Sequence, residues 1–216
     1  MFFRLVCLLL VIESKDAATN DNDSRALEAF RAGVGDPEGA LRTWEGLDPC
    51  GDSWEGVACR GENVLQLLLA RKGLVGTVPS ELGRLAHLQM LVLNGNSFTG
   101  AIPHSLGNLT ELRYLWLDSN YFTGFVPEEA LYNLEELTDL NLQSNPVLCG
   151  ALDVSRLPEN ATLDLSDTLI NQECPAPPPP PFPSHHLAHH RRPPLASTTF
   201  PVPICARLSR KAPSPH

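Results

Sequence analysis

The sequence predicts an α/β solenoid: a short right-handed coil of stacked repeats with a parallel β-sheet on its concave side. Three observations support this fold class. Leucine accounts for 36 of the 216 residues, and 26 of these leucines lie between Val64 and Ile170. Within that segment the motif Leu-x-Leu-x-x-Asn recurs at steps of 24, 24, 25 and 23 residues, the last copy being degenerate. One cysteine pair precedes this segment and a second pair brackets its end, as expected of a solenoid with disulfide-capped ends.

Composition divides the chain into four predicted parts. We expect a secretory signal peptide at 1–18, an N-terminal cap at 19–63, four to five repeats with a C-terminal cap at 64–174, and a disordered tail rich in proline and histidine at 175–216. Up to residue 174 there are 11 basic and 25 acidic residues, a net charge of −14, whereas the tail carries +5. An acidic body is a poor partner for phosphate backbones, so nucleic-acid binding is not expected.

The first residues resemble a secretory leader. Arg4 provides a short positive start, and residues 5–12 form an apolar run. The cleavage site is not evident, and an unprocessed N-terminus is the alternative. No later segment has 18 consecutive apolar residues, so no transmembrane helix is predicted. Three Asn-x-Ser/Thr sequons also fit secretion, and their predicted glycosylation sites are Asn22, Asn108 and Asn160.

Cysteine spacing fits an oxidising compartment. Cys50 and Cys59 bracket a short loop before the repeats, and Cys149 and Cys174 bracket the end of the repeats. We expect these to form two disulfides. Cys205 is left over in the tail, either free or available for an intermolecular bond. Neither pair has the Cys-x-x-Cys or Cys/His spacing of a zinc site.

The segment before the repeats predicts a short helix and an aromatic cover for the first repeat. Asp23 and Ser24 can cap the helix, and Asp36 followed by proline would end it. Trp44 and Trp54 offer large apolar faces beside the first cysteine pair. The apolar residues at helical spacing are Ala26, Leu27, Phe30 and Val34.

Each repeat contains two short extended segments. In Leu-x-Leu the two leucines point inward and the middle residue points outward, so stacked repeats bury one another's leucines. The Asn enters the turn, where its amide can satisfy backbone groups that strand pairing does not reach. Lys72 and Thr168 replace the Asn in the first and last copies. A second motif, Gly-x-Ile/Val-Pro, follows the first three copies, with glycine for a tight bend and proline to stop further pairing.

These features together resemble a known family. Residues 48–59, Asp-Pro-Cys-Gly-Asp-Ser-Trp-Glu-Gly-Val-Ala-Cys, resemble the N-terminal cap of plant leucine-rich-repeat proteins, and the repeats resemble the plant-specific class. The resemblance covers residues 23–174. It implies an extracellular recognition scaffold, as in the ectodomains of receptor-like kinases, receptor-like proteins and polygalacturonase inhibitors. The chain has no kinase motifs, so the resemblance implies recognition without signalling by this chain, which could be a truncated receptor ectodomain.

The outward residues of the stacked strands predict a binding face. Tyr114 and Trp116 stand near its middle as candidate anchors for a partner loop or peptide. The alternative is that these aromatics only cover their lateral neighbours within the sheet. The other predicted ligand-binding residues are Met90, Val92, Asn94, Asp118, Asp139 and Asn141.

The predicted function is therefore extracellular recognition of a protein or peptide, at the cell surface or in the apoplast, with a receptor-kinase co-receptor as one candidate partner. Two alternatives remain: a secreted inhibitor of cell-wall hydrolases, and a wall-associated structural protein that acts through its proline-rich tail. No catalytic motif, cofactor or metal site is predicted. Metal binding by the tail is a minor alternative, and the residues concerned are His185, His186, His189 and His190.

Overall fold

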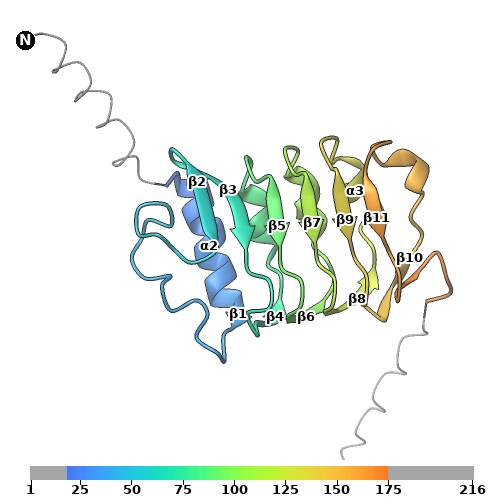
Figure 1. Cartoon of the computed structure of the whole chain (residues 1–216), viewed down its shortest axis with the longest axis horizontal. Coiled ribbons are helices and arrows are strands. Elements are labelled where there is room, and N and C mark those ends of the chain that lie inside the picture. Colours follow the sequence, from blue (N-terminus) through green and yellow to red (C-terminus); the bar gives the residue numbers. More distant parts are fainter. Residues whose placement is uncertain (1–18, 175–216) are drawn as a thin grey trace, which may run out of the picture. The chain divides into compact units, whose positions relative to one another are not determined.

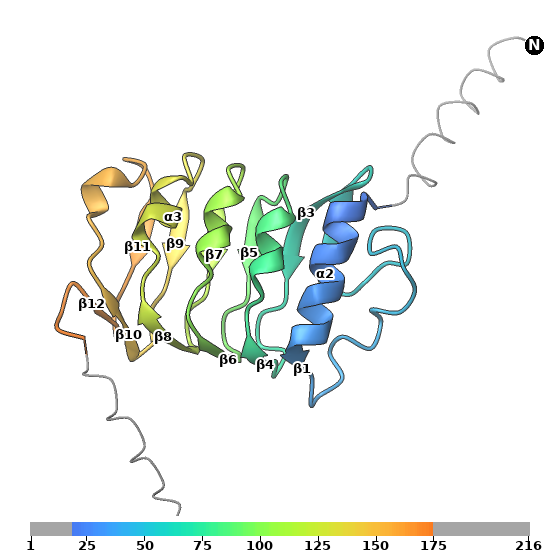
Figure 2. The same cartoon turned by 180° about the vertical axis from the view of Figure 1, so that it is seen from behind.

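A computed structural model describes residues 19–174, which form a solenoid of short stacked repeats. The predicted signal peptide, proline-rich tail and tail histidines lie outside the described residues. The strands of one sheet stand side by side along one face (Figure 1). The helical segments cover the opposite face (Figure 2). This architecture confirms the predicted fold class.

The concave sheet has six strands, and neighbours are parallel except for the first two. In spatial order they are β2 (Val57–Arg60), β3 (Asn63–Leu68), β5 (Met90–Val92), β7 (Tyr114–Trp116), β9 (Asp139–Asn141) and β11 (Thr162–Asp164).

A second six-stranded sheet follows the turn of each repeat, and only its first pair is antiparallel. In spatial order its strands are β1 (Val34–Gly35), β4 (Val75–Thr77), β6 (Ser97–Gly100), β8 (Tyr121–Phe125), β10 (Val147–Gly150) and β12 (Leu169–Ile170). The helical segments are α2 (Asp21–Gly33), η1 (Ser80–Arg84), η2 (His104–Asn108), α3 (Glu128–Tyr132) and η3 (Val154–Arg156).

The core is a column of leucines between the two sheets and the helical face. In the first repeat Leu67 and Leu69 are fully buried while Leu68 between them is 37% exposed, which confirms the predicted orientation of the Leu-x-Leu motif. The column weakens at the C-terminal end, where the equivalent Leu163 and Leu165 are only partly buried.

A ladder of buried asparagines joins successive repeats, as predicted. Asn120 is typical: its Oδ1 accepts the backbone N–H of Phe98 at 3.0 Å, and its Nδ2 donates to the carbonyls of Leu93 and Leu117, each at 3.1 Å. One side chain therefore satisfies backbone groups of two neighbouring repeats. Asn96 and Asn145 make the equivalent bonds.

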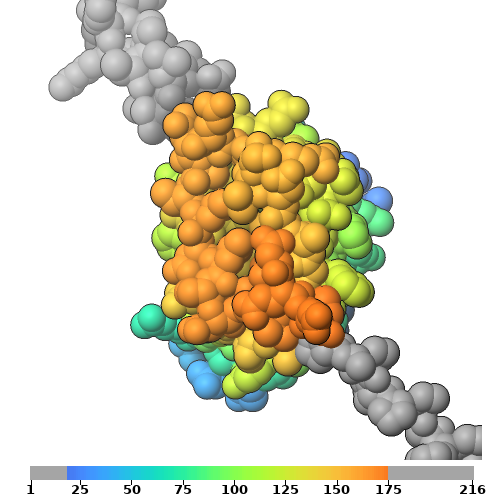
Figure 3. Space-filling model, turned by 90° about the vertical axis from the view of Figure 1, so that its right-hand side faces the viewer, coloured from blue at the N-terminus to red at the C-terminus, as the bar shows by residue number. Residues whose placement is uncertain are grey.

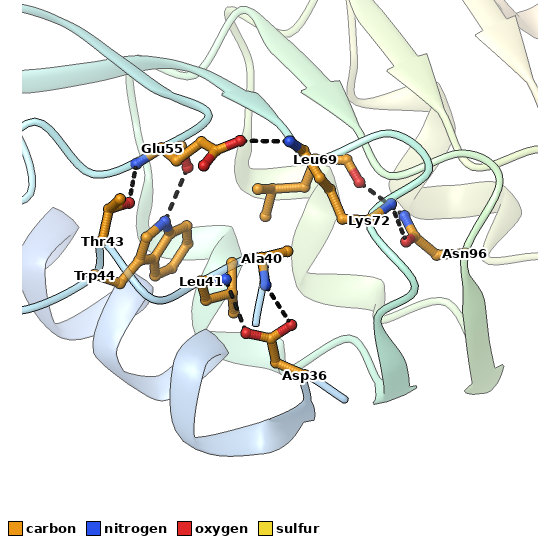
Figure 4. Close-up of polar contacts among 9 residues, drawn as sticks. All are labelled: Asp36, Ala40, Leu41, Thr43, Trp44, Glu55, Leu69, Lys72 and Asn96. Atoms are coloured by element: carbon orange, nitrogen blue, oxygen red, sulfur yellow. Dashed lines mark hydrogen bonds and ion pairs between the residues drawn. The ribbon is translucent and has the colours of Figure 1, made fainter. Parts of the chain in front are cut away.

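The cap closes the N-terminal end of the column with stacked aromatics. The rings of Trp44 and Trp54 lie 4.8 Å apart between centroids, both are almost fully buried, and the Cys50–Cys59 disulfide is formed beside them. A chain of polar contacts continues into the repeats (Figure 4). The Trp44 indole N–H donates to the Glu55 carbonyl at 2.8 Å, the Glu55 carboxylate pairs with Lys72, and the Lys72 backbone N–H donates to Asn96. Lys72 thus replaces the ladder asparagine at the repeat that contacts the cap.

The predicted start and end of the cap helix are wrong. Asn20, not Asp23 or Ser24, is the N-cap residue, because its side chain accepts the N–H of Asp23 at 3.0 Å. Asp23 is buried instead and accepts the N–H of Val64 at 2.8 Å; burial raises the pKa of its carboxyl group. The helix ends before Val34, which pairs with Gly76 in the second sheet.

The C-terminal end is covered by the last part of the described chain, drawn in orange in the end-on view of Figure 3. The Cys149–Cys174 disulfide is formed there, as predicted. Closing a loop with a sequence separation of 25 contributes about 3.5 kcal/mol in the chain-entropy model. It offsets the weaker burial of the last repeat.

Candidate functional site

The structure brings the predicted ligand-binding residues together on the concave sheet. Strand register aligns Met90, Tyr114 and Asp139 in one row. The next row contains Val92, Trp116 and Asn141. Asn94 and Asp118 follow at the ends of their strands. All eight are partly exposed except for one buried residue, which is described next.

Val92 is that exception, with an exposed fraction of only 6%. Its place between Leu91 and Leu93 in a Leu-x-Leu motif predicts an outward, ligand-facing side chain. Its neighbours in the same row, Leu68 and Trp116, are large, and outward side chains of adjacent strands cover one another. Val92 therefore packs between Leu68 and Trp116 and offers little surface to a ligand.

Tyr114 and Trp116 form an oriented aromatic pair at the centre of the face. Their ring centroids are 6.2 Å apart and the planes meet at 85°, an edge-to-face arrangement. The Trp116 indole N–H donates to Oδ1 of Asp139 on the next strand at 2.9 Å. The indole is thus hydrogen-bonded to a lateral neighbour, which agrees with the alternative that these aromatics cover adjacent residues of the sheet. Both rings nevertheless remain partly exposed.

Acidic residues accompany this pair on the outward side of the later repeats. Asp118 accepts the hydroxyl of Ser119 at 3.2 Å, and Asp164 accepts both the N–H and the hydroxyl of Ser166 at 3.1 and 2.7 Å. The Ser166 hydrogen bonds lower the pKa of Asp164. Within residues 19–174 no basic side chain pairs with Asp118, Asp139 or Asp164, so a basic partner would meet uncompensated carboxylates.

One polar atom of the face lacks a partner. Oδ1 of Asn94 is buried, and no donor among the described residues reaches it. By contrast, Oδ1 of Asn141 accepts the N–H of Gln143 at 3.1 Å. An unsatisfied buried acceptor costs stability.

The three predicted glycosylation sites, Asn22, Asn108 and Asn160, are all exposed. No helix within residues 19–174 is long and apolar enough to cross a membrane. The same residues contain no cluster of three potential metal ligands.

Family models match two segments. Residues 20–60 match the leucine rich repeat N-terminal domain, and residues 86–147 match the leucine rich repeat. A probable leucine-rich repeat receptor-like protein kinase of Arabidopsis thaliana is 34% identical over 97 residues, which are 44% of this chain and 10% of the relative. The receptor-like kinase FEI 2 of the same species is 39% identical over 95 residues, 41% of this chain and 16% of the relative. The chain thus spans less than a fifth of these relatives, and only their ectodomain region matches.

Solved structures agree with these matches. The ectodomain of BIR2 from Arabidopsis thaliana superposes with a TM-score of 0.62 at 29% identity, covering 71% of this chain and 83% of that one. The ectodomain of the Arabidopsis receptor kinase HAESA, solved with a peptide hormone ligand, gives 0.61 at 28% identity, covering 69% and 25%. This ectodomain fold is a recognition module. Residues 20–60 and 86–147 therefore carry a leucine-rich-repeat N-terminal cap and leucine-rich repeats, and the chain is similar to the extracellular part of plant receptor-like kinases.

Proposed function

We propose that this protein acts outside the cell and recognises a protein or peptide through the concave face around Tyr114 and Trp116. The observation that carries the proposal is the aromatic pair itself. Its edge-to-face contact and the Trp116–Asp139 hydrogen bond hold two partly exposed rings in one arrangement. Rings that are ordered before binding lose little conformational entropy when a partner arrives.

The charges of the face favour a partner with basic or hydrogen-bond-donating groups. Asp118, Asp139 and Asp164 lack basic partners among the described residues. A peptide ligand fits a row of outward side chains across parallel strands. It is also the class of ligand in the HAESA structure, which was solved with a peptide hormone. A receptor-kinase co-receptor is a second candidate partner.

Loss of the two rings is expected to weaken peptide binding at least tenfold without unfolding the protein. The rings are partly exposed, so their removal affects the surface more than the core, whereas central aromatic anchors each contribute about 2 kcal/mol or more to binding. A random peptide library is selected on the wild-type protein. The affinities of the selected peptides are then measured for the wild type and for the double variant Tyr114→Ala, Trp116→Ala.

Phe125→Ala provides a matched control for this measurement. Phe125 is 70% exposed and lies in the second sheet, so its loss removes an exposed ring outside the concave face. Selected peptides that bind the double variant as tightly as the wild type would contradict the assignment. If the protein inhibits a fungal polygalacturonase and the double variant inhibits it equally well, the hydrolase-inhibitor alternative would be favoured.

Secretion predicts a second measurable property. When the full chain is made in plant cells, we expect it in the extracellular fluid with glycans on Asn22, Asn108 and Asn160, because all three side chains are exposed. Mass spectrometry before and after enzymatic deglycosylation measures this directly. A variant with all three asparagines replaced by glutamine should show no mass change. Recovery of an unglycosylated wild-type chain from the cytosol would refute the extracellular assignment.

A further inference from the structure

A hollow of about 410 Å³ lies on the rim where the chain leaves the concave sheet and turns towards the second sheet. Ser119, Ser144 and Asp167 hold the same position in three successive repeats, with φ angles of 55°, 54° and 54°. They share this backbone conformation because the chain makes the same tight turn in each repeat. The hollow is lined by Ser119, Asn120, Tyr121, Ser144, Pro146 and Asp167, among others.

The hydrogen-bonding capacity of this rim is one-sided. The hydroxyl of Ser119 donates to Asp118 at 3.2 Å, and that of Ser144 donates to Asp167 at 3.5 Å, because a carboxylate has no proton to give. The amide of Asn120 is fully used by backbone groups of the ladder. Apart from the Tyr121 phenol, the lining side chains therefore offer acceptors to a ligand and no free donors.

The aromatic ring and the carboxylates of the rim also favour a cationic ligand. The Tyr121 side chain lines the hollow and is 58% exposed, and an aromatic face attracts a cation. Neither Asp118 nor Asp167 forms an ion pair within residues 19–174. The basic residue at the equivalent turn position is Arg71 in the first repeat. Its side chain lies against Gly95, next in sequence to Asn96, which lines the N-terminal side of the hollow, and Arg71 itself is not among the lining residues.

We infer that this rim groove, lined by Tyr121, Ser119, Ser144 and Asp167, binds the guanidinium group of an arginine side chain on a partner peptide. A guanidinium has five N–H donors, no acceptor and a planar shape that stacks on aromatic rings. It therefore matches a hollow in which Asp167 and the serine oxygens accept hydrogen bonds beside a tyrosine, whereas a carboxylate or phosphate would find only the Tyr121 hydroxyl as a free side-chain donor. The groove lies outside the concave strands, so the inference holds whether or not Tyr114 and Trp116 contact a ligand.

The test uses a small probe and the full chain. N-acetyl-arginine methylamide is titrated into ¹⁵N-labelled protein, and the uncharged norleucine analogue is titrated in parallel. We expect saturable amide shifts at Ser119, Tyr121, Ser144 and Asp167 with the arginine probe alone, weakened by added salt because the pair is exposed. Asp167→Asn should weaken binding about fivefold, since asparagine tolerates the left-handed backbone of this turn and only the charge is lost. Tyr121→Ala should weaken it by a similar factor.

Glu135→Gln serves as the control, because it removes one exposed carboxylate that does not line this groove. Unchanged binding in this variant shows that net charge alone does not explain the effect. Equal shifts with the norleucine analogue, binding unaffected by both Asp167→Asn and Tyr121→Ala, or no shift at millimolar probe would each overturn the inference.

Discussion

Replacing Trp44 with alanine is expected to lower the free energy of unfolding by about 4 kcal/mol, because a large buried aromatic side chain is removed from a packed core. Trp44 is fully buried, stacks on Trp54 at 4.8 Å and lies 5.9 Å from the ring of Phe30. Its indole N–H also holds the carbonyl of Glu55, whose side chain pairs with Lys72 (Figure 4). The variant therefore loses the cover of the first repeat together with the polar connection between cap and repeats.

Guanidinium unfolding followed by circular dichroism measures this loss. Leu47→Ala is a suitable control, since Leu47 lies in the same cap and is 80% exposed; its effect should stay within about 0.5 kcal/mol. A loss below about 1.5 kcal/mol for Trp44→Ala would show that the aromatic cover is not what closes this end of the core. The slope of the unfolding free energy against denaturant concentration should also be compared between the wild type and the variants. A smaller slope in Trp44→Ala would indicate that the cap unfolds separately from the repeats.

Asn120→Ala is expected to cost about 3 kcal/mol, which is the second large effect. The side chain is 3% exposed, and its removal leaves the N–H of Phe98 and the carbonyls of Leu93 and Leu117 without this partner inside the core. Unsatisfied buried groups cost about 1–3 kcal/mol each, and partial access of water to the turn reduces the sum. Because the three backbone groups belong to two neighbouring repeats, the substitution should weaken the interface between these repeats and lower the stability of both.

The same unfolding measurement applies to this variant, with Asn133→Ala as its control. Asn133 is an exposed asparagine at the end of α3, where replacement should change stability by no more than about 0.5 kcal/mol. If Asn120→Ala were as stable as Asn133→Ala, the ladder would contribute nothing beyond the leucine column.

Much of the fold follows from local patterns that repeat along the chain. The 23–25-residue period predicted the parallel strands of the concave sheet but not β2, which comes from the cap, and the Leu-x-Leu motif predicted which leucines are buried. Both disulfides could be predicted because each pair brackets an end of the repeats. The cap helix was less predictable. Asn20, Asp23 and Ser24 are all good N-cap residues, and the packing of Asp23 against Val64 decides between them.

The candidate site could be predicted only in part. Outward positions follow from the alternation of side chains along a strand, which placed Tyr114, Trp116 and Asp139 on one face. Exposure depends also on the size of lateral neighbours, and this is why the burial of Val92 was missed. The bond from Trp116 to Asp139 depends on the register between strands 23 residues apart in sequence.

The sequence by itself thus determined the repeat, the inward leucines, the asparagine ladder and the disulfide pairs, because each depends on residue type and on spacing along the chain. Only the tertiary structure decided three other features: the closure of the second sheet by β1, the orientation of the Tyr114–Trp116 pair, and the hollow beside Tyr121. The physical reason is that each of these features requires side chains or strands of different segments to meet at one register. A short repeated motif specifies the local structure of each repeat, but the alignment of side chains from different segments is set only when the repeats pack together.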